Sequence, residues 1–117
     1  MIKDDMVYLG HMLDYALRAV CKVKDINRDD FDDNDDLRLA LVHLIQIVGE
    51  AARLVSDECR EKYPVIPWTK IIGMRHRIVH NYINIQFRIV WDVVKYELPS
   101  LVEELEKIVP PEEFTAD

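Results

Sequence analysis

The chain has 117 residues, of which 50% are hydrophobic and 32% charged, a balance that indicates one folded domain and excludes a disordered segment. No apolar run approaches the length of about 20 residues that crosses a bilayer, and the N-terminus is too acidic for a signal peptide. We therefore expect a cytoplasmic protein with no membrane partner. Cys21 and Cys59 stand far apart and outside any CxxC pattern, which favours reduced thiols over a disulfide or a metal site.

Helical periodicity dominates the first half of the chain. Residues 3–24 carry apolar side chains three and four positions apart, as on one face of an amphipathic helix. The aspartate-rich residues 29–36 lack the central Gly and distal Glu of a calcium-binding loop, so we interpret them as a solvated connection whose last residues cap the next helix. Residues 35–61 are predicted to form the longest helix, because Leu, Val and Ala recur in a coiled-coil-like spacing.

This longest predicted helix is apolar over most of its circumference. Such a helix is either central in a bundle or shared with a second subunit. The small residues Gly49, Ala51 and Ala52 would let another backbone approach it closely.

In the second half of the chain, two prolines between residues 63 and 68 end the longest helix. A shorter helix is predicted over residues 68–80, followed by a connection over 82–85 and a last helix over 86–108. Pro99 should bend this last helix or locally unwind its turn at Lys95.

These elements predict an all-α fold, an up-and-down bundle of four to five helices. The domain is expected to cover residues 1–109, and the two prolines after it should begin a loose tail over 110–117.

The charge is distributed unevenly along the chain. The net charge of −7 disfavours general binding to nucleic acid, yet residues 62–91 contain five Lys or Arg and no Asp or Glu, so that they carry +5 and the remaining residues −12. Because screening limits electrostatic reach to about 10 Å at ordinary ionic strength, the local sign matters most to an anionic ligand. This basic window, residues 62–91, is where such a ligand is expected.

The stretch from Gly73 to Tyr82 lies inside the basic window and concentrates its polar chemistry. It places fixed cations beside groups that titrate near neutral pH, an amide and a phenol: Arg75, His76, Arg77, His80, Asn81 and Tyr82. A phosphate site needs positive charge to hold the anion and a titratable group to move protons. The stretch supplies both.

Spacing alone leaves two interpretations of this stretch. Arg75 and His80 are five positions apart, which on an ideal helix is a turn of about 500° and does not put them on one line. They can converge if the helix ends around His80, or if copies from two subunits meet. Otherwise the residues form a solvated basic cluster near a helix C-terminus, where cations are favoured in any case.

The chain resembles the HepT-like branch of the HEPN domains over nearly its whole length. The resemblance is carried most specifically by residues between Gly49 and Pro99: Gly49-Glu50-Ala51-Ala52, Tyr63-Pro64, Ile66-Pro67-Trp68, Ile71-Ile72-Gly73-Met74-Arg75, Val79-His80-Asn81-Tyr82, Val90-Trp91 and Leu98-Pro99. The family signature of Arg, four residues, His, one residue, Tyr is met by Arg75, His80 and Tyr82. His76 stands where the family usually has another polar residue, often Asn.

This resemblance implies a homodimeric HEPN bundle that acts as a metal-independent endoribonuclease and needs no cofactor. It implies the toxin of a type VII, HepT/MNT toxin–antitoxin pair. The partner would be a small MNT-type nucleotidyltransferase antitoxin, which silences the toxin by attaching AMP to the motif tyrosine, here Tyr82.

Elementary chemistry agrees with these roles. RNA carries its own nucleophile, the 2′-hydroxyl, so cleavage needs a base to take that proton and a cation at the phosphorus. His80 would be the base, or the acid that protonates the leaving oxygen, and Arg75 would pair with the phosphate oxygens. His76, Arg77 and Asn81 are candidates for substrate binding. Two subunits that place two motifs in one cleft would supply both an acid and a base.

Two other functions remain open at this stage. The chain could be a non-catalytic nucleotide- or substrate-binding subunit that partners a nucleotidyltransferase, with the arginine and histidine binding phosphates only. It could also be a structural helical partner whose basic window docks an acidic protein. Substitution of His80 by alanine separates these functions from a nuclease, because only a catalyst loses its toxicity to cells.

Overall fold

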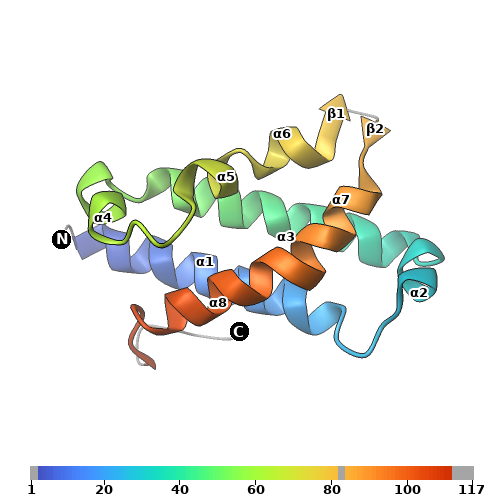
Figure 1. Cartoon of the computed structure of the whole chain (residues 1–117), viewed down its shortest axis with the longest axis horizontal. Helices are drawn as coiled ribbons and strands as arrows, with labels where there is room; N and C mark the ends of the chain where they lie inside the picture. Colours follow the sequence, from blue (N-terminus) through green and yellow to red (C-terminus); the bar gives the residue numbers. More distant parts are fainter. Residues whose placement is uncertain (1–2, 82–83, 112–117) are drawn as a thin grey trace.

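The computed structural model describes residues 3–81 and 84–111 and shows a helical bundle with one short β-ribbon (Figure 1). The elements in chain order are α1 (Lys3–Lys22), α2 (Arg28–Asp32), α3 (Asp35–Leu54), α4 (Asp57–Lys62), α5 (Trp68–Ile72), α6 (Met74–Ile78), β1 (Val79–Asn81), β2 (Asn84–Ile85), α7 (Phe87–Asp92), the π-helix η1 (Val93–Glu97) and α8 (Leu98–Glu106). The predicted all-α HEPN-type fold is confirmed. Several of the predicted long helices are divided into shorter ones.

The core of the bundle is formed by α1, α3 and the last helical series, α7–η1–α8. Figure 1 shows α1 and α3 side by side along the long axis, with the α7–η1–α8 series crossing them. The predicted amphipathic faces point into this core, where the fully buried side chains include Leu9, Met12, Leu41, Ile45, Val48, Leu98 and Leu105. Burying each large side chain contributes about 1.5–3 kcal/mol. Within the described residues, no helix is long and apolar enough to cross a membrane.

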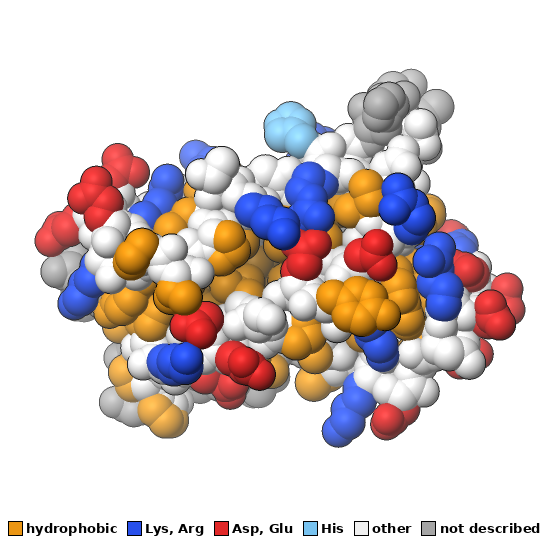
Figure 2. Space-filling model, in the orientation of Figure 1, with side chains coloured by type: hydrophobic (Ala, Val, Ile, Leu, Met, Phe, Trp, Pro, Cys, Tyr) orange, Lys and Arg blue, Asp and Glu red, His pale blue; other side chains and the backbone are white. Residues whose placement is uncertain are grey.

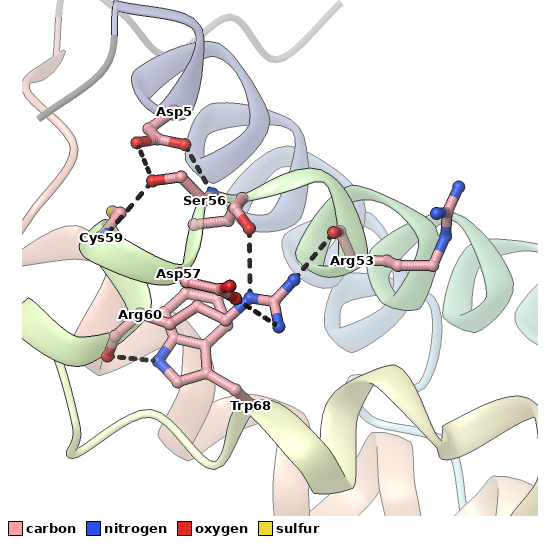
Figure 3. A network of polar contacts seen from close by, with 8 residues as sticks. Asp5, Arg53, Ser56, Asp57, Cys59, Arg60 and Trp68 are labelled. Atoms are coloured by element: carbon pink, nitrogen blue, oxygen red, sulfur yellow. Dashed lines mark hydrogen bonds and ion pairs between the residues drawn. The ribbon is translucent and has the colours of Figure 1, made fainter.

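Helix α3 ends earlier than predicted. The helix expected over residues 35–61 stops at Leu54, and α4 begins at Asp57 with Ser56 as its N-cap. The carboxylate of Asp5, on α1 and 2% exposed, accepts hydrogen bonds from the backbone N–H of Ser56 (2.8 Å) and from its hydroxyl (2.7 Å), as Figure 3 shows. A contact between residues 51 positions apart therefore stabilises the break, which local periodicity does not reveal.

The aspartate-rich segment is more than a solvated connection. It contains α2, whose N-cap Asn27 accepts a hydrogen bond from the N–H of Asp30. Phe31 of α2 is fully buried, with its ring centroid 5.1 Å from that of Trp91. The predicted capping of the next helix is confirmed in Asn34, whose side chain accepts from the N–H of Leu37 (3.0 Å). Among the many aspartates of this segment, the single aromatic residue Phe31 packs into the core and holds the segment there.

The last helix is disturbed one turn before Pro99, as predicted. Residues 93–97 form the π-helix η1 between α7 and α8, and Pro99 lies in the first turn of α8. Pro99 has no N–H to offer to the carbonyl of Lys95, so the regular ladder of hydrogen bonds cannot continue through this turn. The Lys95 ammonium donates to the carbonyl of Val23 at 3.0 Å, which ties η1 to the end of α1.

The segment that carries the sequence motif differs from the predicted single helix over residues 68–80. It divides at Gly73 into α5 and α6, and its helical part ends at Ile78. β1 then pairs antiparallel with β2, with Val79 opposite Ile85, so the predicted connection over 82–85 is wrong for Asn84–Ile85. Branched side chains such as those of Val79 and Ile85 favour a strand over a further helical turn.

Candidate active site

Helix α6 is a short platform that is anchored at both ends. Met74 and Ile78, four positions apart, are buried in the core. The residues between them therefore project from the bundle, with Arg75 and His76 exposed and Arg77 half-buried. Because neighbouring positions on a helix differ by about 100°, Arg75 and Arg77 leave α6 in nearly opposite directions.

Arg75 lies at a cavity of about 130 Å³ between α3 and α6. The cavity is lined by Ile45, Gln46, Gly49, Glu50, Arg53, Ile72, Arg75 and His76. Within the part of the chain that the structure describes, no ion pair or hydrogen bond engages the Arg75 guanidinium. Among the described residues, nothing therefore competes with an anionic ligand for this cation.

Arg77 is engaged in an ion pair on the other side of α6. Its Nη1 and Nη2 atoms donate to the two carboxylate oxygens of Glu97, each at 2.8 Å. Lys70 on α5 adds a contact of 3.3 Å between its Nζ and Oε1 of Glu97. The hydrogen bonds from Arg77, more than the charge of Lys70, lower the pKa of Glu97 below its ordinary value. Figure 2 shows basic side chains beside an acidic one in this region, between α5–α6 and the C-terminal helix.

Glu97 reduces the positive charge that the basic window presents in the folded protein. The window contains no acidic residue in sequence, yet Glu97 reaches into it from η1 and pairs with two of its five cations. Arg77, a candidate for substrate binding, is thus held in a structural ion pair. Sequence reasoning missed Glu97, since it stands 20 positions from Arg77 and no helical spacing relates them.

The structure describes only part of the predicted motif beyond α6. The backbone of His80 and Asn81 lies in β1, while their side chains and the whole of Tyr82 lie outside the described residues. One condition for convergence of Arg75 and His80 is met, because the helix ends at Ile78. The interatomic arrangement of Arg75, His80 and Tyr82 stays a prediction.

The large apolar residues around the motif belong to the core. Trp68 and Met74 are buried, and the indole N–H of Trp68 donates to the carbonyls of Arg60 (3.1 Å) and Tyr63 (3.0 Å). Trp91 is buried against Phe31, and Phe87 is half-buried. Among the side chains that the structure describes, no group of three or more His, Cys, Asp or Glu residues could hold a metal ion.

Comparisons with known proteins agree with this fold. The family model described as "Ribonuclease HepT-like" matches residues 12–108. The chain is 32% identical to "Putative RNase MJ0125" of Methanocaldococcus jannaschii over 92% of each chain. It is 33% identical to "Putative RNase TTE0752" of Caldanaerobacter subterraneus, covering 95% of this chain and 99% of that protein. It is also 29% identical to "Probable ribonuclease HepT" of Thermococcus cleftensis, over 90% of each.

The helical bundle with its exposed Arg75 thus falls in a defined class, the HEPN-type ribonucleases. Within that class, the chain belongs to the HepT-like ribonuclease family. No solved structure matches the chain significantly.

Proposed function

We propose that this protein is a metal-independent endoribonuclease that cleaves RNA with the motif Arg75, His80 and Tyr82. The observation that carries the proposal is the contrast within α6. Arg75 is exposed at a cavity and has no ionic partner among the described residues, whereas Arg77 is paired with Glu97. This contrast supports Arg75, the motif arginine, as the cation that meets the phosphate.

In the proposed reaction, His80 takes the proton of the RNA 2′-hydroxyl, and the 2′-oxygen attacks the adjacent phosphorus. A new phosphorus–oxygen bond forms, and the bond to the 5′-oxygen of the next nucleotide breaks. That oxygen leaves with a proton from a general acid, so the products are a 2′,3′-cyclic phosphate and a 5′-hydroxyl. Arg75 stabilises the extra negative charge that develops on the phosphoryl oxygens.

The proposed reaction needs an acid as well as a base, and the motif Arg75, His80 and Tyr82 contains one histidine only. We propose a homodimer in which two motifs face one cleft, so that one His80 acts as base and the other as acid. Asn81 and His76 would bind or orient the phosphate.

We further propose that the protein is the toxin of a HepT/MNT toxin–antitoxin pair in the cytoplasm. The partner is an MNT-type nucleotidyltransferase antitoxin that transfers AMP from ATP to the hydroxyl of Tyr82, whose oxygen bonds to the α-phosphorus while pyrophosphate leaves. The modification would add a phosphodiester charge and a nucleotide's bulk to the motif. Both effects oppose RNA binding, because the added charge competes for the same cation.

Growth of a bacterial host after induction of the chain alone tests this function, with His80→Ala as the matched variant. Arrest by the native chain, relief by the substitution, and cleavage of RNA by purified protein in the presence of a chelator are expected. If neither chain arrests growth and the purified protein cuts no RNA, the result would favour the alternative function, a non-catalytic nucleotide-binding subunit that partners a nucleotidyltransferase.

A further inference from the structure

The cavity beside Arg75 contains a second arginine outside the sequence motif. Arg53 projects from the last turn of α3 and lines the cavity together with Glu50, Arg75 and His76. The Arg53 guanidinium binds the Glu50 carboxylate, with distances of 2.5 Å from Nη2 to Oε1 and 3.3 Å from Nε to Oε2. The cavity thus has a basic residue on each wall.

The α3 side of the cavity is held in position by hydrogen bonds to the backbone at Arg53. The guanidinium of Arg60 donates to the backbone carbonyls of Arg53 (2.8 Å) and Val55 (3.1 Å). Figure 3 shows that the Arg53 side chain extends away from this network while its backbone is part of it. The network therefore fixes the base of the side chain and leaves its guanidinium, which is more than half exposed, at the cavity.

The opposite wall is tied to the same network. The carbonyl of Arg60 accepts the indole N–H of Trp68, the first residue of α5. Farther along α5, the backbone passes so close to α3 that a Cβ atom on Gly49 would lie 3.1 Å from the carbonyl oxygen of Ile71. This close approach, which sequence reasoning left open to a second subunit, occurs inside one chain. It holds the two basic walls at a set spacing.

The charges at the cavity favour an anion. Arg53 and Arg75 are fixed cations, and Glu50 is the one acidic residue of the lining. The hydrogen bond from Arg53 lowers the pKa of Glu50, so that at neutral pH the two arginines exceed the acidic charge by one. The cavity volume of about 130 Å³ is several times the ~30 Å³ that one water molecule occupies in the liquid, which leaves room for a phosphate group.

We propose that this cavity is a subsite for a second phosphodiester of the RNA, next to the one that Arg75 stabilises during cleavage, and that Arg53 binds this second phosphodiester. Glu50 orients the Arg53 guanidinium when no RNA is bound. This subsite rests on the proposed ribonuclease function, and it names a residue of α3 as a substrate-binding group.

Equilibrium binding of a short single-stranded RNA with methylated 2′-hydroxyls tests the subsite, because such RNA binds but offers no nucleophile. Arg53→Gln should weaken binding by the full-length protein about tenfold at low salt. It should also reduce the slope of log K against log salt by about 0.7, the contribution of one phosphate contact on a single strand. Arg53→Lys should restore the slope and part of the affinity.

Glu50→Gln is the matched partner variant, because it removes the same ion pair from the other side. If Arg53 binds phosphate, the two substitutions act in opposite directions, since Glu50→Gln removes a negative charge from the cavity and should tighten binding about twofold. Arg28→Gln is the control. Arg28 forms a similar exposed pair with Asp32 near the other end of α3, about 30 Å away by the length of the helix, and its loss should leave binding unchanged.

Native-like binding by Arg53→Gln, or equal weakening by Arg53→Gln and Glu50→Gln, would overturn the subsite. Thermal unfolding of each variant checks that the fold is intact. Cleavage of unmodified RNA by the native chain is measured separately. If the native chain cleaves and Arg53→Gln binds normally, only the subsite is wrong. If the native chain does not cleave, the ribonuclease proposal fails, while the binding data still decide whether Arg53 contacts a phosphodiester.

Discussion

The two sides of α6 use the same residue type for different purposes. On the side of η1, Arg77 forms a two-pronged ion pair with Glu97, reinforced by Lys70. On the side of α3, Arg75 is exposed at a cavity that it shares with Arg53, which is paired with the exposed carboxylate of Glu50. The ion pair of Arg77 joins α6 to η1, while a guanidinium with no ionic partner among the described residues keeps its donors for a ligand. Sequence neighbours can therefore divide structural and chemical roles between them.

The largest expected effect is the loss of RNA cleavage when Arg75, rather than Arg77, is replaced. Arg75→Ala should lower kcat/KM for RNA by about 10²–10³-fold, because a cation at the reacting phosphate is lost. Its effect on the free energy of unfolding should stay within about 0.5 kcal/mol, since the side chain is exposed. Steady-state cleavage and urea unfolding of the same preparations measure both quantities. Normal cleavage by Arg75→Ala would remove the basis of the proposed mechanism.

Arg77 should show the reverse pattern. Arg77→Ala leaves Glu97 with Lys70 alone and should lower the free energy of unfolding by about 1 kcal/mol, an amount limited by solvent screening at these partly exposed side chains. A double-mutant cycle with Glu97→Gln, followed by urea unfolding, isolates the coupling between the two groups. A coupling energy near zero would show that the pair does not hold α6 against η1.

The pH dependence of stability sharpens the same contrast. Since the pKa of Glu97 is lowered in the folded protein, its contribution is fully present above the unfolded value near 4.5 and is lost as the pH falls through the folded pKa. Unfolding free energies between neutral and acid pH should therefore fall less steeply below about pH 4.5 in Glu97→Gln than in the native chain. Identical acid profiles would contradict the assigned ion pair.

The smallest effect is expected from Gly49→Ala, which changes the spacing between α3 and α5 at the cavity. Gly49→Ala gains about 1 kcal/mol of helix propensity. It also places a methyl group 3.1 Å from the carbonyl oxygen of Ile71, so that α5 must shift by a few tenths of an ångström. Little net change in the thermal midpoint is expected, together with a modest rise in KM for RNA. A large gain in stability with unchanged KM would show that the walls adjust without consequence for the cavity.

Local patterns were sufficient for much of the architecture. The three- and four-residue spacing of apolar side chains predicted α1 and most of α3, because helical periodicity depends only on neighbouring residues. Pro99 predicted the disturbance that became η1, since a missing N–H acts on a carbonyl one turn away. The sequence also predicts Arg75 and His76 as candidate site residues from their residue types, and in the structure both line the cavity between α3 and α6.

Tertiary structure decided the features that depend on residues distant in the chain. Asp5 stabilises the end of α3 across 51 positions, and Glu97 engages Arg77 across 20. Arg53 and Arg75 line one cavity because α3 and the α5–α6 segment pack together, with their closest backbone approach at Gly49. Such ion pairs and close approaches arise from the packing of whole helices, whereas residue spacing records only the local path of the chain. The sequence by itself therefore predicted which residues could carry the chemistry, and the fold determined which of the described charges are held in ion pairs.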